Sequence, residues 1–71
     1  MDDKYIYKSI GKKIKLLREN QNLTQEKLAE KANVSLDYIG KIEVNINNPG
    51  LKSLIKISNA LGVHIKDLFD F

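Results

Sequence analysis

Few side chains in this chain could carry out acid–base or metal chemistry, and their spacing does not favour it. His64 is the only histidine and there is no cysteine, so thiolate chemistry is excluded and a structural zinc site is not expected. Glu26 and Glu30 stand four residues apart beside Lys27 and Lys31, which is typical of a charged helix face. The sequence contains neither a triad pattern around His64 nor a glycine-rich phosphate loop. We therefore predict that the chain is not an enzyme and has no catalytic residue, metal or cofactor. His64 is expected to cap the last helix or to lie on the surface.

Arg18 stands out because it is the only arginine beside eleven lysines. A planar guanidinium forms two parallel hydrogen bonds with a carboxylate, which an ammonium group does not do. We take Glu43 as the partner and predict a structural ion pair that ties the first helix to the middle of the chain. The alternative is an exposed arginine without a partner.

The stretch Leu23–Asn45 is typical of two short amphipathic helices joined by a tight turn. Thr24 and Ser35 are good N-cap residues, and each lies between two apolar residues at the spacing of a hydrophobic staple. Asn33 tolerates the left-handed conformation that ends a helix. This pattern predicts a helix-turn-helix, and an ordinary helical hairpin in a small bundle is the alternative.

Apolar periodicity and breaker residues predict one all-α domain over residues 1–71 with five helices. Residues 1–4 are expected to fray, and Asn45 and Gly62 are expected to end the third and fourth helices. The expected helices span residues 5–20, 24–31, 35–43, 50–61 and 65–69. The predicted core is Ile10, Ile14, Leu17, Leu23, Leu28, Ala32, Val34, Ile39, Ile42, Leu54, Ile57, Leu61, Val63 and Leu68.

The charge is distributed unevenly along the chain. The formal net charge is +3, and residues 1–23 alone carry six basic and three acidic side chains. Residues 24–45 carry three lysines against four acids, so the predicted motif is slightly negative. This balance permits binding to a polyanion without demonstrating it. No apolar run reaches the roughly 18 residues of a membrane span, and the expected location is the cytoplasm.

Three groups of residues together resemble the phage-repressor and Cro type of helix-turn-helix regulator, the XRE family. They are LTQEKLAEKANVSLDYIGKIE from Leu23 to Glu43, then Asn48-Pro49-x-Leu51, then Ala60-Leu61-Gly62-Val63. The resemblance covers about Ile10 to Phe69. It implies a compact five-helix, lambda-repressor-like domain that places its third helix in the DNA major groove.

The resemblance also implies roles for individual residues, including the pairing of Arg18 with Glu43. The positions that face DNA bases are Ser35, Leu36, Asp37 and Lys41. The positions that contact DNA phosphates are Thr24, Gln25, Tyr38, Asn45 and Asn47. Leu36 and Asp37 stand where Arg, Gln, Ser or Thr is frequent; Leu36 suits a thymine methyl group and Asp37 suits cytosine N4. Gly40 and Ile46 also depart from the usual pattern.

The leading hypothesis is a sequence-specific regulator of transcription, by default a repressor, that binds double-stranded DNA as a homodimer at a two-fold symmetric operator. Ile65, Phe69 and Phe71 remain outside the predicted core, either as a closing lid or as the dimer interface. We expect no small-molecule effector. The alternative function is a protein-binding adaptor such as an antitoxin or an anti-repressor component, because the motif is acidic and carries Leu36 and Asp37.

Overall fold

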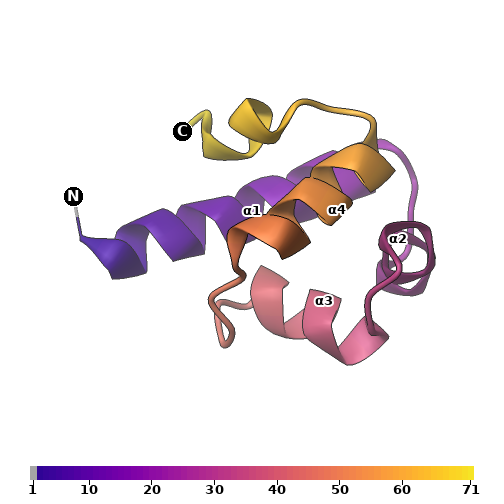
Figure 1. Cartoon of the computed structure of the whole chain (residues 1–71), viewed down its shortest axis with the longest axis horizontal. Helices are drawn as coiled ribbons and strands as arrows, with labels where there is room; N and C mark the ends of the chain where they lie inside the picture. The colour runs from indigo at the N-terminus through magenta and orange to yellow at the C-terminus, as the bar shows by residue number, and fades with distance from the viewer. Residues whose placement is uncertain (1) are drawn as a thin grey trace.

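The computed structural model describes residues 2–71, which form four α-helices and one 3₁₀ helix (Figure 1). The elements are α1 (Asp3–Asn20), α2 (Gln25–Ala32), α3 (Leu36–Glu43), α4 (Leu51–Leu61) and η1 (Ile65–Phe69). All five predicted helices are present, and their ends lie within two residues of the predicted ones. The last is a 3₁₀ helix, in which the Asp67 N–H donates to the His64 carbonyl oxygen at 2.9 Å. So short a segment suits this tighter winding.

The start of α1 differs from the prediction. The side chain of Asp2 is the N-cap, and its Oδ1 accepts a hydrogen bond from the Tyr5 N–H at 2.9 Å. The helix therefore begins at Asp3, and the prediction that residues 1–4 fray was wrong for residues 2–4. Met1 lies outside the described residues. A carboxylate in this position also interacts favourably with the helix dipole.

The predicted caps of the helix-turn-helix are confirmed. Thr24 Oγ1 accepts from the Lys27 N–H and Ser35 Oγ accepts from the Tyr38 N–H, each at 3.0 Å. Asn33 ends α2 with φ +57° and Asn45 follows α3 with φ +61°, so both adopt the left-handed conformation. The caps and Asn33 thus define the turn between α2 and α3 through local contacts, and Asn45 lies in the turn after α3.

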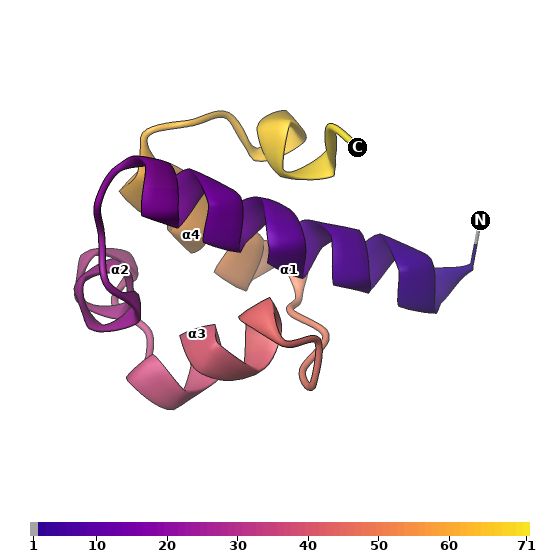
Figure 2. The ribbon, with the colours of Figure 1, turned by 180° about the vertical axis from the view of Figure 1, so that it is seen from behind.

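In Figure 1, α1 and α4 cross at the centre, α2 and α3 lie below and to the right, and η1 lies above. The view from behind shows the same order of elements (Figure 2). The C-terminal end lies on the same side of the molecule as the start of α1, and there the rings of Tyr5 and Phe71 pack edge to face with centroids 6.1 Å apart (Figures 1 and 2). This contact joins the end of the chain to the start of α1.

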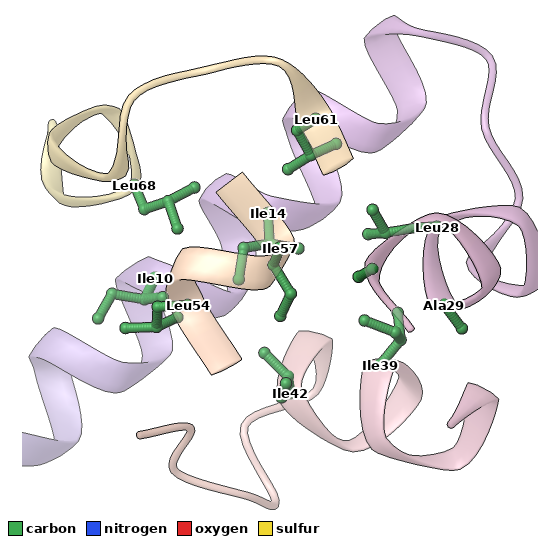
Figure 3. Packing of buried hydrophobic residues seen from close by; sticks show 11 residues of the cluster. Ile10, Ile14, Leu28, Ala29, Ile39, Ile42, Leu54, Ile57, Leu61 and Leu68 are labelled. Atoms are coloured by element: carbon green, nitrogen blue, oxygen red, sulfur yellow. The ribbon is translucent and has the colours of Figure 1, made fainter. Parts of the chain in front are cut away.

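All five elements contribute to one apolar core (Figure 3). Most of the predicted core is buried, and Ala29 joins it. Leu17, Leu23, Val34 and Val63 are only half-buried and pack against its edge. Ile65 also packs there, so it is partly a core residue rather than wholly left over.

Gly11 marks the closest approach between α1 and α3. It is buried, and a Cβ atom at this position would overlap the carbonyl oxygen of Ile42. A backbone carbonyl cannot move aside as the end of a flexible side chain can. The absence of a side chain at Gly11 therefore sets how closely the two helices pack.

We expect Gly11→Ala to lower the free energy of unfolding by about 2 kcal/mol, because overpacking outweighs the gain in helix propensity. Gly40→Ala is the matched control, since a Cβ there makes only ordinary contact with the Gln25 side chain. That variant should be as stable as the parent or up to about 1 kcal/mol more stable. Urea unfolding of both measures the difference. Equal stability of the two variants would show that α1 and α3 are not in close contact at Gly11.

Candidate nucleic-acid interface

The outer face of α3 presents the side chains predicted to contact bases. Ser35 and Leu36 are exposed at its start, and Leu36 keeps 47% of its surface accessible. Asp37 and Lys41 lie one turn apart and form an ion pair with an Nζ–Oδ2 distance of 3.0 Å. Both side chains remain accessible, at 75% and 44%. The face is therefore polar and close to neutral, with one exposed apolar side chain at its leading end.

Arg18 and Glu43 form the predicted ion pair, and both residues are buried. Arg18 Nε and Nη2 donate to the two carboxylate oxygens of Glu43 at 2.7 and 3.0 Å. Arg18 Nη1 also donates to the carbonyl oxygen of Leu23, at 2.7 Å. One guanidinium thus joins α1 to the end of α3 and to the entry of α2.

The hydrogen bond to Glu43 raises the pKa of Arg18 above its ordinary value, although burial acts in the opposite direction. The guanidinium therefore stays charged at any pH at which the protein would be studied. The prediction of a structural pair is confirmed, and an exposed arginine is excluded.

Gln25 belongs to the same network, which the sequence did not suggest. Its side-chain amide donates to Glu43 Oε1 at 3.0 Å, so in the free protein it is bound to a carboxylate. The amide carries two N–H groups and this bond uses one of them, so a phosphate can be reached by the second N–H while the first stays on Glu43. A phosphate can also bind the backbone N–H groups in the first turn of α2, because these groups have no hydrogen-bond partner within the helix.

The remaining predicted phosphate contacts lie beside α3. Tyr38 is half-buried against the core, whereas Thr24 is exposed at the start of α2. Asn45 and Asn47 are half-buried in the loop that joins α3 to α4, and the Asn47 N–H donates to the Lys41 carbonyl oxygen at 3.3 Å. Ile46 between them is 69% exposed. The start of α2, the face of α3 and this loop thus adjoin one another.

Two contacts at this site were missed from the sequence. The Asp37–Lys41 pair had a visible signal, since the residues are spaced i and i+4 on one helix. The Gln25–Glu43 hydrogen bond had none, because the two residues are far apart in the sequence and meet only when α2 and α3 pack. The predicted dimer residues are not part of this site. They lie on η1 and at the end of the chain: Ile65, Phe69 and Phe71.

Within residues 2–71, no cluster of three or more histidine, aspartate or glutamate side chains is arranged to hold a metal ion. The same part of the chain has no helix that is both long and apolar enough to cross a membrane.

Comparison with known proteins gives consistent matches. Residues 14–68 match the family described as helix-turn-helix. The immunity repressor protein of Bacillus phage phi105 is 42% identical over 57 residues, which is 80% of this chain but only 40% of the repressor. Control protein C.BamHI of Bacillus amyloliquefaciens is 44% identical over 62 residues, covering 86% of this chain and 76% of that protein. Among solved structures, the restriction-modification controller protein C.AhdI from Aeromonas hydrophila superimposes with a TM-score of 0.87 at 28% identity, over 89% of this chain and 96% of the controller.

The Arg18–Glu43 pair should show strong energetic coupling in a double-mutant cycle. Removing one partner leaves a buried charge without compensation, so Arg18→Met or Glu43→Gln alone should cost about 3–5 kcal/mol of folding free energy. The double variant should lose less than the sum of the two, because it leaves neither charge behind.

The exposed pair Lys27–Glu30, with 4.0 Å between charged atoms, is the matched control. Its coupling should not exceed about 0.5 kcal/mol. Denaturant unfolding measures both cycles. If a single variant of Arg18 or Glu43 fails to fold while the double variant folds, that result also demonstrates coupling. Additive losses for Arg18 and Glu43 would contradict the predicted coupling.

Proposed function

We propose, because this chain belongs to the helix-turn-helix family, that it is a sequence-specific regulator of transcription which binds double-stranded DNA as a homodimer. Its operator would be two-fold symmetric, with half-sites about one helical turn apart. The names of two relatives, an immunity repressor and a control protein, favour repression or a related control of transcription. The observation that carries the proposal is the exposed face of α3 flanked by the capped start of α2 and by the Asn45–Asn47 loop.

In the proposed complex, α3 lies in the major groove and its outer face meets the base edges. Leu36 contacts a thymine methyl group, and Ser35 donates from its hydroxyl, whose oxygen already accepts within the helix. Lys41 donates to a guanine and Asp37 accepts from the N4 of its paired cytosine, so the observed ion pair opens onto a C·G base pair. An acid on this face disfavours any position where it would meet a phosphate.

The phosphate contacts would hold α3 in register on either side of the groove. Thr24 and Gln25 lie at the start of α2, where the N–H groups and the helix dipole attract an anion. Tyr38, Asn45 and Asn47 supply polar groups beside α3. These contacts would set the position of the protein on the duplex without selecting bases.

An apolar surface away from α3 is the candidate dimer interface. Leu51 and Ile55 share one face of α4 and are 65% and 44% exposed. Phe69, which is 42% exposed, lines a hollow with Leu51 between α1 and α4. Phe71 lines a neighbouring hollow with Tyr5 and Leu16, and Ile65 is half-buried on η1. We include both in the proposed interface. A second copy of the chain would cover it and place two α3 helices on one side of the dimer.

DNA binding is tested by fluorescence anisotropy with fragments from upstream of the chain's own gene. We expect salt-sensitive, sequence-selective binding that Lys41→Ala weakens by about 5- to 150-fold, because one good base contact is worth about 1–3 kcal/mol. Lys66→Ala, which removes an exposed lysine from η1, is the matched control and should change affinity little. Equal affinity of the unaltered chain for every sequence would sink the proposal, and binding to a protein partner alone would favour the adaptor function.

Dimerisation is tested by sedimentation of the double variant Phe69→Ser, Phe71→Ser. We expect the mass to fall from two copies to one, because the variant removes the largest exposed apolar groups of η1 and the chain end. Leu36→Ser removes a similarly exposed apolar group from the face of α3 and should leave the mass unchanged. An unchanged dimer in the Phe69, Phe71 variant would place the interface elsewhere.

A further inference from the structure

Three lysines of α1 line one hollow on the side of the molecule next to the end of α3. Lys4, Lys8 and Lys12 recur at every fourth residue, and the opposite wall is formed by Glu43, Val44 and Asn45. We call this hollow, with its six lining residues, the lysine groove. It is open to solvent and has a volume of about 450 Å³. Its lysines are spread over about 12 Å along α1, which suits an extended anionic chain better than one small ligand.

The positive charge of the lysine groove is not neutralised within the protein. Glu43 is its only acidic lining residue, and both of its carboxylate oxygens already accept hydrogen bonds from Arg18. No ion pair joins Lys4, Lys8 or Lys12 to any acid among residues 2–71. The three ammonium groups of the groove therefore have no neutralising acid, because the one negative charge in the opposite wall, that of Glu43, is balanced by Arg18.

Asn45 places the lysine groove beside the proposed DNA-binding face. It lines the groove, and it begins the loop whose side chains are the proposed phosphate contacts. Its Oδ1 is buried without a hydrogen-bond partner among the described residues. An amide oxygen accepts hydrogen bonds, so this atom would not itself hold an anion. The lysines that line the groove with Asn45 therefore adjoin the loop of the proposed phosphate contacts.

We propose that the lysine groove is a second binding site for backbone phosphates of the DNA duplex that α3 reads. The site takes phosphodiester groups next to those at the Asn45–Asn47 loop and is indifferent to base sequence. It supplies positive charge that the slightly acidic segment from residue 24 to residue 45 lacks. This inference rests on the proposed function, since it requires the chain to bind DNA.

The test compares two triple variants of the full chain with the same change in charge. The first replaces Lys4, Lys8 and Lys12 by Gln, and the control replaces Lys52, Lys56 and Lys66, on α4 and η1, by Gln. Affinity for the operator is measured from about 50 to 200 mM salt. Each lost phosphate contact should reduce the slope of log K against log salt by about 0.9, equivalent to about eightfold weaker binding at 0.1 M when binding at 1 M is unchanged.

We expect the groove variant to lose two or three such units of slope, to keep its preference for the operator over scrambled DNA, and to unfold at the same urea concentration as the parent. A matching variant with Arg at the three positions should retain the full slope, because charge and reach are kept. Replacing single DNA phosphates by neutral methylphosphonates should weaken binding of the parent chain at the phosphates that contact the groove, and should not weaken binding of the Gln variant there. These phosphates should lie next to the ones identified in the same way with Asn47→Ala.

An equal loss of slope in the two Gln variants, or no loss in either, would overturn the inference and leave the proposed function standing. Failure of the unaltered chain to bind any duplex would instead remove the proposed function itself. Loss of slope that the Arg variant does not restore would also count against a phosphate site, because it would point to a change in structure.

Discussion

The buried pairing of Arg18 with Glu43 is the interaction on which the geometry of the candidate site depends. A charge taken out of water must be met by opposite charge and hydrogen bonds, and both are present here. The two carboxylate oxygens accept three N–H groups, two from Arg18 and one from Gln25. Since such a pair is weak evidence for net stability, its consequence lies in position. Arg18 can satisfy Glu43 and the Leu23 carbonyl together only when α1, the entry of α2 and the end of α3 meet at one point.

The close packing at Gly11 makes this pairing possible. Gly11 and Arg18 are seven residues apart, about two helical turns, so they lie on the same face of α1. The partner of Gly11 is the carbonyl of Ile42, and the next residue along α3 is Glu43. A side chain at Gly11 would push the end of α3 away from α1 and lengthen the reach demanded of Arg18. Steric contact and electrostatic contact therefore act on the same few atoms, and they constrain the helix proposed to enter the DNA groove.

What could be predicted from the sequence was mainly local. Thr24 and Ser35 have the side chains that cap a helix, and Asn33 has the tolerance for a left-handed backbone that its turn needs. Arg18 was informative because one arginine among many lysines implies a geometric demand. Gly11 was not, since a glycine inside a helical pattern predicts only weakness. Its role depends on a carbonyl more than thirty residues away, and no local pattern carries that information.

The candidate site shows the same division. The base-facing positions of α3 follow from the family resemblance, and in the structure Ser35, Leu36 and Asp37 are exposed and Lys41 is partly exposed. Gln25 was assigned to phosphate from its position alone, whereas in the folded chain its amide already donates to Glu43. A side chain with two possible partners cannot be assigned by pattern, because its free-state partner arises only from packing between α2 and α3. The assignment of bases and phosphates thus remains a prediction.

The arrangement of charge gives a reason for the acid on α3, the helix proposed to read the bases. Lys41 alone would be attracted to any phosphate, and such attraction contributes to binding at every sequence. When Lys41 is paired with Asp37, the two side chains present one donor and one acceptor with a net charge of zero. Their binding to DNA then depends on the donors and acceptors along the base edge. A helix of this kind gains little affinity from charge, and attraction to the duplex must come from elsewhere on the protein. In the proposed complex, the lysines of α1 would supply that attraction without touching the base edges. Affinity and selectivity would then rest on two different helices, which Arg18 and Glu43 hold together.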